Sequence, residues 1–190
     1  MVQNNFQLFL DGLRGELSAL TTTARCAFAT AMCERHFPDY LLFMAQEGWG
    51  NPAVLRETID AGWAACSTNG QQANNLSERC EFVTPDSEDF SSVAASFGLN
   101  AALMAAHLAA FLNAQNIEDV FWIASLGRDT ADAKATNELP SFIFYTPAIE
   151  QEIRASRWMV EELDAQKILL QEVSGQELNI DKIRDQARKF

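Results

Sequence analysis

The chain has only two histidines, His36 and His107, and this number restricts the metal chemistry available to it. A di-iron helical bundle needs a Glu-x-x-His motif on each of two helices. The residue three before His36 is Cys33 and the residue three before His107 is Met104, so that motif is missing. Cys33 and His36 could supply half of a zinc site, but half sites of this spacing are common by chance. We therefore predict no metal site and no cofactor.

Acidic residues one helical turn apart offer a second kind of chemistry, because two such carboxylates can hold Mg²⁺ for phosphoryl transfer. With 26 acidic residues in a chain of 190, chance alone gives about three or four such pairs. We therefore interpret the acidic pairs of this chain as parts of solvated helix faces. The alternative is that they belong to a Mg²⁺-dependent hydrolase of small phosphates or nucleotides. The sequence has neither of the common glycine-rich phosphate loops. The five pairs are Glu57/Asp60, Glu78/Glu81, Asp86/Asp89, Asp129/Asp132 and Glu161/Asp164.

Asn100 and His107 lie seven residues apart in an otherwise apolar segment, which places them on one helix face. The purely structural interpretation is that His107 is hydrogen-bonded within the protein or half-exposed, and binds no ligand. The alternative is a small-metabolite site that uses His107, the side chain that titrates near neutral pH.

Glu34, Arg35 and Tyr40 belong to the most distinctive run of the sequence, residues 33–40. Charged residues that close an apolar helix usually cap its free carbonyl groups, and this predicts that Arg35 and His36 end a helix. The alternative is that Glu34, Arg35 and Tyr40 face a groove. No residue is assigned a catalytic role.

The composition predicts an all-α protein. Alanine, the best helix former, occurs 28 times, whereas the β-branched residues valine and isoleucine together occur 16 times. Without an internal repeat or a linker, residues 1–190 are predicted to form one domain, an up-and-down bundle of about seven or eight helices.

Several helix ends can be predicted from local signals. Pro38 should start a new helix, because proline suits a first turn. One long helix is expected from Pro147 to about Val173, and an uncharged helix from about Ser91 to Gln115. In the latter, small residues that let another helix approach closely recur at every fourth position, namely Ala94, Gly98, Ala102, Ala106, Ala110 and Ala114.

The formal net charge of −12 argues against nucleic-acid and anionic-membrane partners, because both require a basic surface. Residues 93–112 are uncharged and long enough to span a bilayer. However, eight of these twenty residues are alanine and both flanks are acidic, which favours a buried helix of a soluble bundle. The four cysteines match no disulfide or zinc framework, so we expect reduced thiols in a cytoplasmic protein.

Four sequence segments together resemble a known family. They are C-E-R-H-F-P-D-Y-L-L-F (33–43), G-W-G-N (48–51), Trp63 and P-A-I-E-Q-E (147–152). They resemble the bacterial family called domain of unknown function 416, over nearly the whole chain. The resemblance implies an all-helical, up-and-down fold in a cytoplasmic protein and transfers no activity, cofactor or catalytic residue. We expect His36 and Asp39 to vary in this family, which argues against a metal or catalytic role for His36.

An unusual aromatic segment follows Pro140 and contains Phe142, Phe144 and Tyr145. Such a segment could anchor a protein partner or a second copy of the chain. The alternative is that these side chains fold into the core. Together with the missing catalytic constellation, this favours a non-enzymatic interaction or regulatory protein that forms a homo-oligomer.

The double variant Phe142→Asp/Phe144→Asp tests this interface. If the segment joins two copies, the buried carboxylates should separate them, and light scattering should report a lower mass than for the parent. An unchanged oligomer would remove the segment from consideration.

Overall fold

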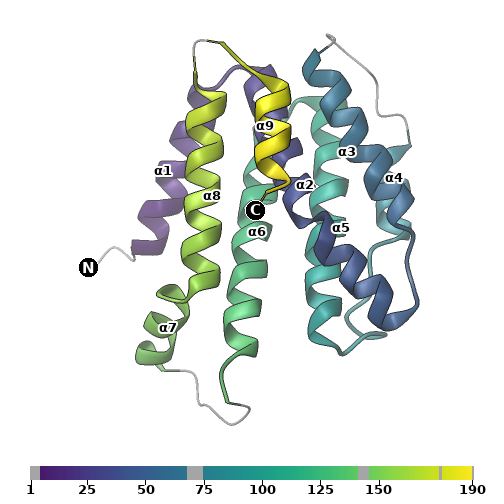
Figure 1. Ribbon diagram of the computed structural model, residues 1–190, viewed down its shortest axis with the longest axis vertical. Helices are drawn as coiled ribbons and strands as arrows, with labels where there is room; N and C mark the ends of the chain where they lie inside the picture. The colour runs from purple at the N-terminus through teal and green to yellow at the C-terminus, as the bar shows by residue number, and fades with distance from the viewer. Residues whose placement is uncertain (1–4, 68–74, 141–145, 176, 190) are drawn as a thin grey trace.

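Nine helices and no strand make up the part of the chain that this computed structural model describes, residues 5–67, 75–140, 146–175 and 177–189. The all-α prediction is confirmed, and the helices outnumber the seven or eight expected. Most of the long ones run along the long axis of the molecule (Figure 1). The helices are α1 (Asn5–Ala19), α2 (Thr22–Glu47), α3 (Pro52–Ser67), α4 (Leu76–Phe82), α5 (Val93–Ala114), α6 (Ile117–Asn137), α7 (Pro147–Arg154), α8 (Arg157–Val173) and α9 (Ile180–Ala187).

The core forms around α2 and α5. Helix α2 packs against α3, α5, α6, α8 and α9, and α5 packs against α2, α3, α4 and α6. Phe28 and Met32 of α2, Leu108 of α5 and Ile123 of α6 are fully buried between them. Side chains at the helix starts supply oxygen acceptors for free backbone N–H groups, as Ser92 does for Ala95 N.

Pro38 lies inside α2, so the prediction that it starts a new helix was wrong. A proline within a helix removes one backbone hydrogen bond, at a cost of about 3 kcal/mol. Packing on both sides of Pro38 outweighs this cost, since His36, Asp39 and Tyr40 are all buried in the same helix. The prediction that Arg35 and His36 cap a helix end was therefore wrong as well, because α2 continues past both residues.

The expected long helix from Pro147 to Val173 is two helices, α7 and α8. Ser156 starts α8, because its side-chain oxygen accepts a hydrogen bond from Met159 N. The break changes the rotational phase of the apolar residues. Ile153 is therefore buried at the end of α7, whereas Val160 is 47% exposed on α8.

The small-residue stripe of α5 is buried over only half of its length. Ala94, Gly98 and Ala102 are buried, but Ala106 and Ala110 are half-buried. A spacing of four residues advances by about 40° per step around a helix of 3.6 residues per turn, so the stripe turns outward. Where it is buried, it allows α2 to come close: a Cβ on Gly98 would lie 2.6 Å from Phe43 Cβ.

Helix α5 is also apolar and long enough to cross a membrane by length and composition. In the described structure, 56% of its most apolar 18-residue window is buried against the other helices. Its remaining surface faces outward.

We expect Gly98→Ala to lower the free energy of unfolding by about 1–3 kcal/mol, because the added methyl group overlaps Phe43. Urea unfolding measures this change. Gly15→Ala is the matched control: Gly15 is an α1 residue with open space around it, and alanine there should stabilise the helix by up to about 1 kcal/mol. Equal effects of the two substitutions would contradict the close packing of α5 on α2.

Candidate functional site

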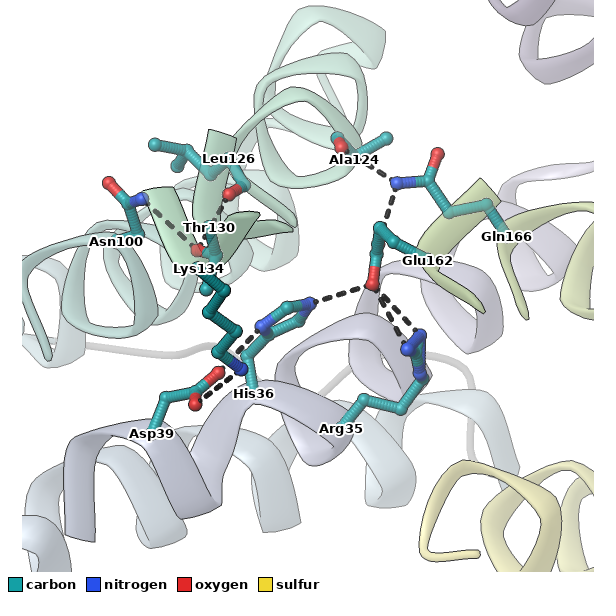
Figure 2. Close-up of polar contacts among 10 residues, drawn as sticks. All are labelled: Arg35, His36, Asp39, Asn100, Ala124, Leu126, Thr130, Lys134, Glu162 and Gln166. Carbon is teal, nitrogen blue, oxygen red and sulfur yellow. Dashed lines mark hydrogen bonds and ion pairs between the residues drawn. The ribbon is translucent and has the colours of Figure 1, made fainter. Parts of the chain in front are cut away.

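A buried cluster of charged side chains joins α2, α6 and α8 (Figure 2). His36 Nδ1 lies 3.0 Å from Asp39 Oδ2 one turn further along α2, and His36 Nε2 lies 3.3 Å from Glu162 Oε2 on α8. Lys134 of α6 forms an ion pair with Asp39, with 2.7 Å between Nζ and Oδ1. One imidazole ring is thus placed between two carboxylates that come from different helices.

Glu162 accepts further hydrogen bonds on both of its oxygens. Arg35 Nη1 and Nη2 donate to Oε2 at 3.2 and 3.0 Å, and Gln166 Nε2 donates to Oε1 at 2.8 Å. Gln166 Nε2 also donates to the backbone oxygen of Ala124 on α6, at 2.9 Å. The side chain of Glu162 is 4% exposed, so its charge is compensated almost entirely by protein groups.

Gly127 of α6 provides the space for this arrangement. A Cβ at this position would lie 2.5 Å from Glu162 Oε1, 2.8 Å from Met32 Cε and 3.1 Å from His36 Nε2. A larger residue here would displace the Glu162 carboxylate and the Met32 methyl group from these positions.

The cluster favours the charged forms of His36, Glu162 and Asp39. Burial alone would lower the pKa of His36, but the adjacent Glu162 and Asp39 carboxylates outweigh it, and the pKa is raised. Burial would raise the pKa of Glu162, but His36 and Arg35 lower it to about 2. The pKa of Asp39 is lowered by His36 and Lys134 against the same effect of burial. The carboxylates of Glu162 and Asp39 are therefore ionised at neutral pH, and His36 keeps its charge to a higher pH than a free imidazole does.

The cluster lines one side of a pocket of about 290 Å³ between α2, α6, α8 and the end of α9. Glu34 and Arg35, two of the groove candidates, both line this pocket. Its buried charges already pair with one another, so the arrangement is suited to holding three helices in register.

Glu34 binds partners on a different side of α2 from Arg35. It accepts two hydrogen bonds from Arg56, at 2.9 and 2.8 Å, and others from Trp63 Nε1 and Arg188 Nε, at 2.9 and 3.0 Å. Burial would raise the pKa of Glu34, but these donors lower it to about 2. Through Glu34, α2 is tied to α3 and to the C-terminal end of the chain.

Tyr40, the third candidate of that run, lies elsewhere. Its side chain is fully buried, and its hydroxyl donates to Val83 O at 2.6 Å and accepts from Asn51 N at 3.2 Å. It closes the packing between α2 and the two connections around Gly50 and Val83. The structure therefore brings Glu34 and Arg35 to one pocket and leaves Tyr40 out of it.

Asn100 and His107 do not form one site. Asn100 Nδ2 donates to Thr130 Oγ1 on α6 at 3.0 Å. His107 Nδ1 lies 2.9 Å from Asp119 Oδ1, and its ring is stacked on that of Trp122, which is 52% exposed. Each side chain is engaged in a contact between α5 and α6, and His107 lies at the surface of the hairpin.

The remaining candidates concern the aromatic segment and the acidic pairs. Phe142, Phe144 and Tyr145 lie outside the described residues. Among the residues that are described, no group of three or more His, Cys, Asp or Glu side chains could hold a metal ion. Glu57 and Asp60, the first acidic pair, instead bind Arg79 and Arg56.

Sequence reasoning missed the roles of Asp39, Lys134, Glu162 and Gln166. Two local signals were present: the His36/Asp39 spacing of three and the Glu162/Gln166 spacing of four, which place each pair on one helix face. Nothing local indicates that these two faces meet, since they are more than 120 residues apart.

Three comparisons relate this chain to known proteins. A family model described as "Protein of unknown function (DUF416)" matches residues 12–189. "Uncharacterized protein YjaG" of Escherichia coli (strain K12) is 28% identical over 92 residues, which are 47% of this chain and less than half, 43%, of that relative. The crystal structure of a DUF416 family protein from Shewanella baltica OS155 has a TM-score of 0.80 and 24% sequence identity, covering 93% of each chain. The similarity to this crystal structure shows that the two chains share a fold.

We expect the free energy of unfolding to fall as the pH rises above about 6.5, the ordinary pKa of histidine. The raised pKa of His36 means that its charge stabilises the folded state fully below that pH, and this stabilisation is lost as the pH rises through the folded-state pKa. His36→Gln should remove the dependence and lower the stability at pH 6 by about 3 kcal/mol, as for one broken buried ion pair.

Urea unfolding between pH 5.5 and 8, below the pH at which the cysteine thiols of the unfolded chain ionise, measures both effects. His107→Gln is the matched control, because it removes the only other histidine, which lies at the surface with Asp119, and should keep the pH dependence. The same decline in wild type and His36→Gln would contradict the role assigned to His36.

Proposed function

The chain belongs to the DUF416 family, whose function is unknown, and we propose that it is a non-enzymatic interaction or regulatory protein that self-associates through the outer face of α5 and α6. The Escherichia coli relative is described as uncharacterised, and nothing in the comparisons indicates an enzymatic activity. Neither the magnesium hydrolase nor the metabolite site at His107 gains support from them. The proposal therefore depends on which surface of the bundle could receive a partner.

The observation that supports the proposal is the incomplete burial of the outward side of α5. A helix that is apolar all round is normally buried all round, yet nearly half of the most apolar window of α5 is not buried in the part of the chain that the structure describes. Its outward residues follow the alternating spacing of three and four that lets two helices pack side by side. None of them is buried: Ser96, Leu99, Leu103, Ala106, Ala110 and Asn113.

Helix α6 widens this surface. Trp122 is 52% exposed beside His107, and Leu126 is half-buried one turn further along. Exposed tryptophan next to aliphatic side chains is typical of interface centres. We call the outward residues of α5 together with Trp122 and Leu126 the α5–α6 face.

A second copy of this chain is the partner that the charge distribution favours. Two acidic chains repel each other, and each carries a net charge of −12. Residues 93–112 contain no formally charged side chain. Two copies that pack along this part of α5 therefore place no acidic side chains of the two α5 helices opposite each other. A cytoplasmic location belongs to the same proposal, and the four buried free cysteines fit a reducing compartment.

Leu103→Glu tests the proposal, because a carboxylate in the middle of the α5–α6 face would be buried without a partner in the dimer. Light scattering after size-exclusion chromatography should give twice the chain mass of 21.1 kDa for the wild type and the single mass for the variant. Val160→Glu is the matched control: it adds the same charge at an exposed apolar position on α8 and should leave the dimer intact.

A wild type that stays monomeric over the accessible concentrations would contradict self-association. A dimer that survives Leu103→Glu but not Phe142→Asp/Phe144→Asp would place the interface in the aromatic segment and remove it from the α5–α6 face.

A further inference from the structure

Helices α2 and α3 run antiparallel and approach each other closely at Gly62. Arg56, near the start of α3, binds Glu34 of α2, whereas Gly62, one and a half turns later, faces Thr30. A Cβ on Gly62 would lie 2.4 Å from Thr30 Oγ1. Only glycine allows the two backbones to come this close.

Two cysteines lie one turn beyond this point, one on each helix. Cys26 precedes Thr30 by four residues and Cys66 follows Gly62 by four, so the antiparallel register brings them together. Cys26 Sγ donates a hydrogen bond to Gly62 O at 3.6 Å, and within α3 the same oxygen is the helical acceptor for Cys66 N–H. The thiol of Cys66 is in turn hydrogen-bonded to that of Cys26.

We propose that Cys26 and Cys66 are a thiol modification site that forms a reversible disulfide when the protein meets a hydroperoxide. A disulfide requires Cα atoms within about 7 Å of each other, which two helices reach only where a small residue lets their backbones approach. Gly62 supplies that approach one turn away. The bond would join α2 to α3 near the start of one and the end of the other.

The chemistry has two steps. The Cys26 thiolate attacks the terminal oxygen of hydrogen peroxide, which breaks the O–O bond and gives a sulfenic acid and, after protonation, water. Cys66 then attacks the sulfenic sulfur, forms the S–S bond and releases a second water. The two thiols lose two protons and two electrons in total, and the peroxide is reduced to two waters.

The contacts of the pair indicate which thiol reacts first. The hydrogen bond from Cys66 lowers the pKa of Cys26, with a smaller contribution from Thr30 against the effect of burial. The same hydrogen bond and burial raise the pKa of Cys66. Cys26 is thus the group that more readily becomes a thiolate, and Cys66 is placed to attack the oxidised sulfur.

The other two cysteines have different surroundings. Cys33 Sγ donates to Met104 O at 3.5 Å, and Cys80 Sγ lies 3.3 Å from Thr58 Oγ1. Burial raises the pKa of both thiols. They therefore serve as internal controls for thiols that are buried but not paired with Cys26 or Cys66.

The experiment treats the full chain with one equivalent of hydrogen peroxide and counts thiols after denaturation. The wild type should fall from four thiols to two, lose two hydrogens in mass, and recover all four with dithiothreitol. A peptide digest without reductant should join residues 26 and 66. Because the bond closes a loop of about 40 residues, the melting temperature of the oxidised protein should rise by roughly 10 °C.

The variants assign the reaction to the pair. Cys33→Ala/Cys80→Ala keeps the pair and should fall from two thiols to none, whereas Cys66→Ala should form no intrachain disulfide. A wild type that keeps four thiols, or a digest that joins a different pair, would overturn the proposal. Either result leaves the oligomer test untouched, because no cysteine lies on the α5–α6 face.

Discussion

Glu162 is the group on which the mutual placement of α2, α6 and α8 depends. A buried carboxylate costs several kcal/mol of lost hydration unless charged or hydrogen-bonding groups replace the water. Here Arg35 and His36 of α2 replace it, together with Gln166, which also reaches the backbone of α6. A shift of any one helix would leave a buried charge without compensation. Such a cluster penalises every register except one, which an apolar core alone does less strictly.

The same constraint explains why α2 continues through Pro38. His36 and Asp39 meet because a helix places residues three apart on one face, and Lys134 then binds the far oxygen of Asp39. If the helix ended at His36, Asp39 would leave this face and Lys134 would lose its ion-pair partner. The lost backbone hydrogen bond at Pro38 is thus offset by contacts to α6 and α8, which are distant in the sequence.

Sequence composition therefore predicted the fold class, and local signals predicted the helix starts at Pro147 and near Ser91, because such signals depend on a few neighbouring residues. They did not predict the course of the chain at Pro38 or at Ser156, where tertiary contacts or a single cap decide the outcome. For the site, Glu34 and Arg35 were named as groove residues, and both line the pocket. Their partners could not be named, since Glu162 lies 127 residues from Arg35.

Helix α6 connects the buried cluster to the α5–α6 face. Gly127 and Lys134 point toward the cluster, whereas Trp122 lies on the opposite, exposed side of the same helix. Because the cluster fixes the rotation of α6 about its axis, it also fixes where Trp122 stands relative to the outward residues of α5. A rigid apolar face loses less side-chain and backbone entropy on association than a mobile one. The buried charges thus define the register of the bundle, and by fixing the rotation of α6 they would also pre-organise the surface proposed for self-association.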